Sequence, residues 1–181
     1  GLIMQVNNDS RLWVVISSTA AAAAATAVPA GATAAPAAGL VTSTCAFTSE
    51  TTNITDTLTA INAHRTQNGL PPYNTNSNLA QAAQSHANDM ACNSLAGHTG
   101  SNGSSIQSRV TATRYVFSFL DENLNVSSPA LTGQAVVNAW LADTTNTQLG
   151  RNLVSDTYID IGIGYAFFNN NGYYVVLFGT P

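Results

Sequence analysis

Residues 158–179 read YIDIGIGYAFFNNNGYYVVLFG and decide the fold class of this chain. They contain two apolar runs, YIDIGIGYAFF and YYVVLFG, which the residues NNNG separate. Both runs are apolar at positions that alternate between the two faces of a strand, which is typical of strands in the middle of a sheet. Asn-Gly is a strong signal for a hairpin turn, so the sequence predicts an antiparallel hairpin near the end of the chain.

Helices are predicted upstream of this hairpin. Apolar residues recur at helical spacing within 54–65, 79–90, 105–113 and 132–143. No internal repeat is visible in the sequence. Helices followed by a hairpin indicate an α+β domain in which the helices pack on a largely antiparallel sheet.

The composition excludes one class of partner. The chain has 181 residues, of which 8% are charged, and its formal net charge is −4. It contains no lysine, and its five arginines are scattered along the sequence. A nucleic-acid surface needs clustered positive charge, so nucleic acid is not expected as a partner.

The first forty residues differ from the rest. A basic residue, Arg11, precedes the apolar run LWVVISSTAAAAAATAV, and several small-x-small sites follow it, as in a secretory signal. We therefore expect residues 1–39 to be a signal or leader or, if they are retained, an N-terminal arm. The run is rich in alanine and threonine, so we expect no stable membrane span. Residues 40–52 are predicted to be a Thr/Ser-rich linker, and residues 53–181 the domain.

The only two cysteines, Cys45 and Cys92, leave two alternatives open. In an exported chain they would form one disulfide, which would stabilise the fold by roughly 4 kcal/mol in the chain-entropy model. Otherwise they are a pair of buried free thiols.

Few polar residues could do chemistry. His86 lies on the apolar stripe of the second predicted helix and His64 near the end of the first, so both are interpreted as structural. His98 lies in the glycine-rich stretch AGHTGSNG, in a loop. Glu122 and Asp143 come from separate segments that could converge on His98, and such a group could bind a metal or move a proton.

The same residues carry a resemblance to a known family, the bacterial branch of the CAP superfamily of cysteine-rich secretory, antigen 5 and pathogenesis-related proteins. The resemblance covers roughly residues 54–179. The matching motifs are N-x-x-R at Asn62–Arg65, H-A-x-D-M-A at His86–Ala91, H-T-G-x-x-G-S-S at His98–Ser105, G-E-N-[IL] as DENL at Asp121–Leu124, E-I-G-[IV]-G-Y-A at Asp160–Ala166, and Y-x-V-x-x-F-G at Tyr174–Gly179.

The resemblance implies a three-layer α-β-α sandwich in an extracellular, secreted or cell-surface protein with a disulfide. It also implies a cleft of two histidines and two acidic residues, which binds a divalent metal in some members. His98, Glu122 and Asp143 take three of these positions. The place of the second histidine falls on or near Leu149, so a zinc site through His98 and Glu122 would be weakened.

Three functions follow from these expectations. The first is a non-enzymatic domain that binds an extracellular ligand, whether lipid, glycan or protein, through its cleft and loops. The second is a structural subunit of a surface layer or fibre, in which residues 1–40 join copies of the chain. The third is a hydrolase with His98 as general base, Glu122 as its orienting or metal-binding partner, and Ser101, Ser104 or Ser105 as a conceivable nucleophile.

Overall fold

The computed structural model describes residues 3–6, 12–15 and 39–181. The chain divides into two units, Gly1–Ala34 and Ala35–Pro181. In the first unit, strand β1 (Ile3–Val6) pairs antiparallel with strand β2 (Leu12–Val15). The rest of the predicted leader or arm, residues 1–39, lies outside the described residues except for Gly39, so its role stays a prediction. Within the described part of the chain, no helix is long and apolar enough to cross a membrane.

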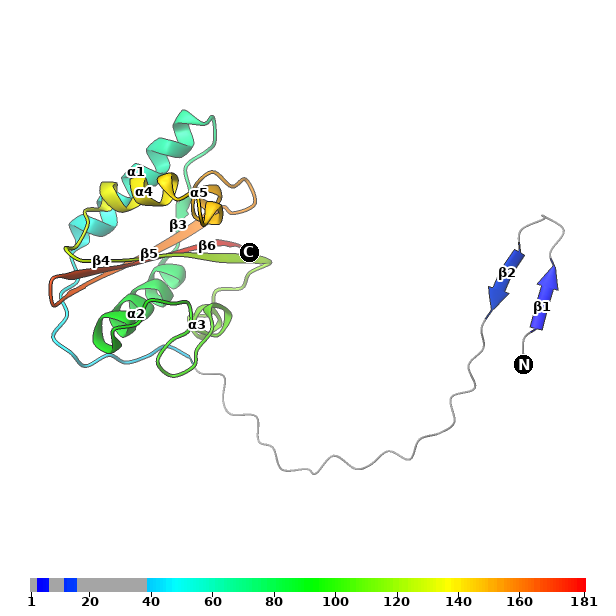
Figure 1. Ribbon diagram of the computed structural model, residues 1–181, viewed down its shortest axis with the longest axis horizontal. Helices are drawn as coiled ribbons and strands as arrows, with labels where there is room; N and C mark the ends of the chain where they lie inside the picture. The colour runs from blue at the N-terminus through cyan, green and yellow to red at the C-terminus, as the bar shows by residue number, and fades with distance from the viewer. Residues whose placement is uncertain (1–2, 7–11, 16–38) are drawn as a thin grey trace, which may run out of the picture. The chain divides into compact units, whose positions relative to one another are not determined.

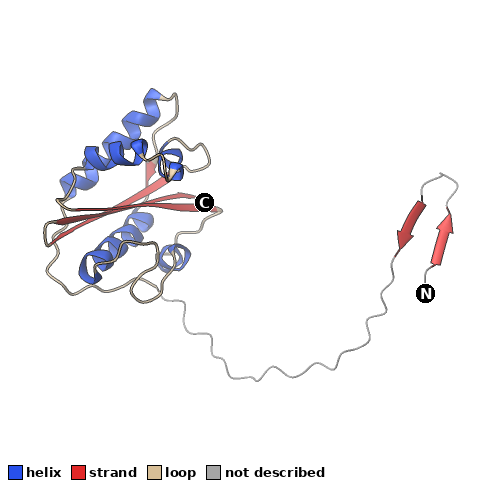
Figure 2. Ribbon diagram, viewed as in Figure 1, coloured by secondary structure: helices blue, strands red, loops and turns tan. Residues whose placement is uncertain are grey.

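The second unit is built on a four-stranded sheet in the order β3-β5-β6-β4 (Figures 1 and 2). Its strands are β3 (Asn74–Thr75), β4 (Phe119–Ser127), β5 (Asp160–Phe168) and β6 (Asn171–Thr180). The short β3 runs parallel to β5, and the other neighbours are antiparallel. The sheet is therefore largely antiparallel, as predicted.

Helices cover both faces of this sheet. One face carries α1 (Thr51–Gln67), α4 (Gly133–Ala142) and α5 (Thr147–Leu153), and the other carries α2 (Ser77–Asn93) and α3 (Ile106–Ala112) (Figure 1). The expected α-β-α sandwich is confirmed.

Strand β6 supplies side chains to the cores on both faces. Tyr174, Val176 and Phe178 pack in the cluster under α1 and α4, whereas Val175 and Leu177 pack in the cluster under α2 and α3. All five are fully buried. Alternate apolar residues of this strand therefore pack in two separate cores, which explains the continuous apolar run in the sequence.

The hairpin turn differs in detail from the prediction. Phe168 pairs with Asn171, so the two central residues are Asn169 and Asn170, and both have positive φ angles. Asn tolerates this left-handed region better than most residues, which suits a two-residue hairpin. The expected Asn-Gly pair begins β6 instead, where a Cβ on Gly172 would lie 2.9 Å from Cβ of Ala130.

Residues 39–50, most of the predicted linker, lie against the sandwich. Cys45 and Cys92 form a disulfide that links this segment to the end of α2. Thr48 pairs with Phe167 of β5 through two backbone hydrogen bonds of 2.8 and 2.9 Å. Helix α1 then begins at Thr51. The predicted disulfide is confirmed, and the pairing ties the chain before α1 to both α2 and the sheet.

Helix α2 approaches β5 so closely that two positions of the strand have no room for a side chain. A Cβ on Gly162 would overlap the carbonyl carbon of Leu79, and one on Gly164 would overlap that of Ala83. These obstacles are backbone atoms, which cannot turn aside as a side chain can. The two glycines therefore set the distance between the helix and the sheet.

We expect Gly162→Ala to lower the free energy of unfolding by about 3 kcal/mol, because α2 would have to move away from the sheet. Gly150→Ala is the matched control: it lies within α5, its Cβ would meet nothing closer than 3.6 Å, and alanine favours helices. Urea unfolding of both variants measures the difference. Equal stability of the two variants would contradict the close-packing interpretation.

Candidate functional site

The loop that carries His98 is held by the end of α2. Asp89 is fully buried, and its carboxylate accepts hydrogen bonds from the backbone N–H of Ser101 at 2.8 Å and from the Ser101 hydroxyl at 2.5 Å. His86 is also buried, and its Nε2 donates to the carbonyl oxygen of Gly97 at 3.0 Å. The structural interpretation of His86 is therefore confirmed.

Arg109 joins α3 to this loop and to β4. Its side chain is 1% exposed. Nη1 donates to the carbonyl oxygens of His98 and Ser104 at 2.9 and 3.1 Å, and Nη2 donates to Oε2 of Glu122 at 2.8 Å. One buried cation thus holds the backbone on both sides of the glycine-rich turn and also binds the acidic residue of the site.

Glu122 completes a chain of three charged or titratable groups. Its side chain is fully buried on β4, and its second oxygen, Oε1, accepts from Nδ1 of His98 at 2.8 Å. The His98 side chain is 55% exposed, so its ring reaches from the buried carboxylate to solvent. The sequence-based pairing of His98 with Glu122 agrees with this geometry.

The two histidines near Glu122 have opposite shifts of pKa. The hydrogen bond to Glu122 raises the pKa of His98 above its ordinary value, because the carboxylate favours the imidazolium. Burial lowers the pKa of His86, because an enclosed imidazole loses the hydration of its charged form. Of the two histidines, His98 is therefore the one that more readily becomes charged.

A second polar group lies within electrostatic range of His98. Asp121 contributes to the raised pKa of His98 through its charge. Its Oδ2 accepts from the Gln148 side chain at 3.3 Å and lies 3.5 Å from the hydroxyl of Tyr158. Burial, followed by the charge of Asp121, raises the pKa of Tyr158. These three side chains come from β4, α5 and the segment before β5, so they form a polar group on the other side of β4 from Glu122.

The structure does not bring Asp143 into this group. Asp143 is the C-cap of α4, and one carboxylate oxygen accepts hydrogen bonds of 2.7–2.8 Å from Thr145 and Asn146 in its own turn. These bonds lower its pKa. Leu149 packs against the core under α1 and α4, while its carbonyl oxygen accepts from Asn123 at 2.9 Å. Gln148, one residue earlier, is the polar side chain that α5 contributes beside Asp121.

The residues present do not fit the metal that the family resemblance implies. Glu122 is fully buried and both its oxygens accept bonds from His98 and Arg109, so a cation bound there would be enclosed beside a guanidinium, which is unfavourable. Among the described residues, no three or more histidine, cysteine or acidic side chains are grouped closely enough to hold a metal ion. We therefore derive no chemistry through zinc.

The three serines considered as nucleophiles all serve the loop or are enclosed. Ser101 donates to Asp89, and Ser105 accepts from the N–H of Ser108 as the N-cap of α3. Ser104 is 1% exposed, and its hydroxyl has no hydrogen-bond partner among the described residues. None of these hydroxyls is hydrogen-bonded to His98, so none is activated as a nucleophile would be.

Sequence reasoning missed Arg109 and Asp121. Asp121 was visible as a departure, because it stands where the motif G-E-N-[IL] has glycine, yet its position on the other side of the strand from Glu122 needed the fold. Arg109 lies on a seven-residue helix whose sequence, IQSRVTA, contains no acidic residue. Because no acidic residue lies near Arg109 in the sequence, the sequence could have indicated that its carboxylate partner comes from another segment.

Comparison with known sequences identifies the family. The sequence profile of the CAP family, described as the cysteine-rich secretory protein family, matches residues 58–178. The match covers more than half of the chain, so this protein belongs to the CAP family. No individual curated protein sequence matches it significantly.

Solved structures show the same fold. An extracellular protein containing an SCP domain from Bacillus anthracis has a TM-score of 0.64 at 20% identity, over 73% of this chain and 41% of its own. An outer surface protein from Borrelia burgdorferi has a TM-score of 0.61 at 23% identity, over 71% of this chain and 92% of its own. A cysteine-rich secretory protein from Staphylococcus aureus has a TM-score of 0.56 at 16% identity, over 71% of this chain and 38% of its own. The first and third matches thus extend over less than half of those proteins.

We expect Arg109→Leu to lower the free energy of unfolding by about 3 to 5 kcal/mol, because it leaves the buried carboxylate of Glu122 without its cation. Arg151→Leu removes an exposed guanidinium that, among the described residues, bonds only to Thr147 on the same helix, and should change stability by less than about 0.5 kcal/mol. Urea unfolding at pH 7 measures both. Similar losses in the two variants would show that the buried pair has no special role.

The raised pKa of His98 predicts a pH-dependent contribution to stability. The folded state holds this proton more tightly than the unfolded state, so the stabilisation is complete below about pH 6.5 and disappears as the pH rises through the folded pKa. The stability difference between wild type and His98→Gln should therefore be larger at pH 5.5 than at pH 9. The change should be less than about 1 kcal/mol, because the ring is half exposed.

Thermal unfolding of the two proteins between pH 5 and 9 measures this difference. His64→Gln, on the last turn of α1, is the control for loss of an imidazole that does not contact Glu122. A difference that grows with rising pH would contradict the assigned sign.

Proposed function

We propose that this protein is an exported CAP domain that binds a polar ligand through the surface around His98 and does not catalyse a reaction. The observation that carries the proposal is the pairing of His98 with a carboxylate whose two oxygens are both engaged. The ring is held in one orientation, yet more than half of the side chain is exposed. This arrangement suits presentation of a fixed hydrogen-bonding group to a ligand.

The neighbours of His98 support binding of a polar molecule. Asp121 provides an acceptor, and Gln148 and Tyr158 provide groups that can donate or accept. They are anchored to different elements of the sandwich, so their spacing is set by the fold. A ligand with several hydroxyl or amide groups, such as a glycan or a peptide, could bond to more than one of them.

Two observations favour binding over catalysis. The serines of the His98 loop hold the loop or are buried, as described above. Glu122 is fully buried and both its oxygens accept from a guanidinium or an imidazole, so it is placed to hold these groups and is closed to a substrate. Glu122 therefore positions the side chains of His98 and Arg109 and does not itself face a ligand.

Export is supported by the disulfide and by the relatives. The Cys45–Cys92 bond is of the kind that persists in oxidising compartments. The Bacillus anthracis protein is described as extracellular, and the Borrelia burgdorferi protein as an outer surface protein. We therefore propose an extracellular or cell-surface location for this chain.

A hydrolase is the second candidate, and one specific observation favours it. A histidine whose Nδ1 is bonded to a carboxylate at 2.8 Å has the orientation of a general base, with Nε2 free to take a proton from water. No protein nucleophile would be needed in that case. The same His98–Glu122 pair thus serves either function, and activity has to be measured.

The test compares wild type, His98→Gln and His64→Gln in two assays. NMR titration with a panel of soluble oligosaccharides and short peptides should identify a ligand that shifts the signals of His98 and Tyr158. Its affinity should fall at least tenfold in His98→Gln and stay unchanged in His64→Gln. Hydrolysis of p-nitrophenyl esters and of labelled casein should equal the buffer rate in all three proteins.

Hydrolysis above the buffer rate that His98→Gln abolishes would establish the hydrolase instead. Ligand binding that is equally strong in wild type and His98→Gln would also contradict the proposal, because the ligand would then bind elsewhere on the domain.

A further inference from the structure

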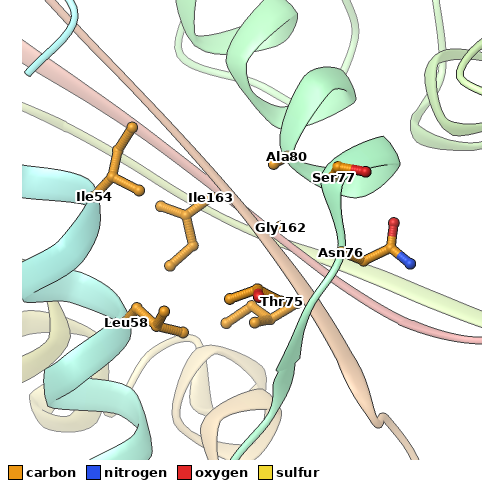
Figure 3. A pocket seen from close by; sticks show the side chains of 9 residues that line it. Ile54, Leu58, Thr75, Asn76, Ser77, Ala80, Gly162 and Ile163 are labelled. Carbon is orange, nitrogen blue, oxygen red and sulfur yellow. The ribbon is translucent and has the colours of Figure 1, made fainter. Parts of the chain in front are cut away.

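A groove lies at the opposite edge of the sheet from His98, where α1 and α2 flank β5 (Figure 3). Its volume is about 350 Å³. Ile54 and Leu58 of α1 project into it from one side, facing Ile163 of β5, and Thr75 and Asn76 border it on the other. The described residues that line it are all uncharged. None of the residues around His98 takes part in it, so this groove is independent of the proposed function.

Along the outer edge of β5, the residues before and after this groove both have hydrogen-bond partners. On one side, β3 runs alongside β5 as far as Ile161, whose carbonyl oxygen accepts from the N–H of Asn76 at 2.9 Å. On the other side, the side-chain amide of Gln84 pairs with Tyr165. It accepts from the N–H of Tyr165 at 3.1 Å and donates to its carbonyl oxygen at 2.8 Å.

Ile163 lies between these two paired positions. The N–H and C=O groups of alternate residues point to the same edge of a strand, so those of Ile163 point to the edge that Ile161 and Tyr165 use. The next acceptor along β3 would be the carbonyl oxygen of Asn76, but this accepts instead from the N–H of Ala80 at 2.9 Å, because α2 begins here. Within the part of the chain that the structure describes, no outer-edge partner of Ile163 is present.

Ile163 itself is only 5% exposed, so this backbone pair lies inside the groove and not on the open surface. Buried backbone groups in proteins are nearly always paired, and an unpaired N–H and C=O at the bottom of a groove therefore have a strong preference for a bonding partner. The groove thus combines apolar walls with one donor and one acceptor at a fixed spacing.

We propose that this groove binds one residue of an extended peptide segment, with an uncharged apolar side chain between Ile54 and Leu58. The N–H and C=O of a single extended residue complement those of Ile163 in both spacing and direction, as in strand addition at a sheet edge. Gln84 and β3 limit the pairing to this one residue. The absence of charged lining residues selects an apolar side chain, because a buried charge would have no partner there.

The test uses the full-length ¹⁵N-labelled protein and the capped peptide acetyl-Gly-Leu-Gly-amide as the probe. NMR titration should shift the amide signal of Ile163 and the side-chain amide signals of Asn76 and Gln84. The same peptide methylated on the leucine nitrogen loses the donor and should bind at least tenfold more weakly. Acetyl-Gly-Asp-Gly-amide should be weakened to a similar extent by its charge.

Two variants address the walls of the groove. Leu58→Ala should weaken binding of the leucine peptide severalfold, whereas Leu141→Ala, on α4 and outside the groove, should leave it unchanged. The spectra of the unbound variants report whether each is folded, and the peptide comparison on wild type does not depend on either variant. Equal binding of the methylated and unmethylated peptides would overturn the proposal in favour of a groove that takes apolar groups without backbone pairing. Absence of binding, or an Ile163 amide already protected from hydrogen exchange without peptide, would overturn it as well.

Discussion

The backbone of α2 contacts the backbone of β5, and the other features of the domain depend on this contact. It is possible because Gly162 and Gly164 have no side chain between the strand and the helix. With α2 fixed at this distance, Asp89 near its end reaches the loop of His98, and Cys92 reaches Cys45. One short approach between two main chains therefore positions both the site and the segment that precedes α1.

The same contact leaves the two faces of the sheet unequal at the β5 edge. On the α2 face the helix lies directly on the strand, whereas the groove on the α1 side is lined by larger side chains, Ile54 and Leu58. Because α2 starts at Ser77, the chain turns away from β5 before Ile163 is paired. The backbone groups of Ile163 are thus unpaired because β3 ends where α2 begins.

At the other edge, a buried ion pair organises the site. Arg109 and Glu122 are both almost completely buried, so each would be strongly unfavourable without the other. The pair leaves one carboxylate oxygen for His98, which fixes the ring and raises its pKa. The acidic residue that the family resemblance assigns to a metal is therefore used here to hold a histidine.

Much of this architecture was predictable, and each exception has an identifiable physical reason. The hairpin of β5 and β6, four of the helices, the disulfide and the His98–Glu122 pair were all expected from the sequence. Strand β4 was not, because its sequence FLDENLNVS is polar at most positions and the polar Glu122 interrupts the apolar face of Leu120, Leu124 and Val126. Asp143 was expected beside His98, yet its own turn supplies three donors that it satisfies locally.

The sequence by itself determined the first four helices and the closing hairpin, the two-sided apolar character of β5 and β6, and the family. These depend on periodicity and motifs, which are properties of neighbouring residues. Only the tertiary structure decided that Glu122 meets Arg109 and His98, which are 13 and 24 residues away along the chain, and that Ile163 keeps an unpaired edge. Such contacts depend on how whole elements pack, because burial and distance between separate segments are set by the complete fold.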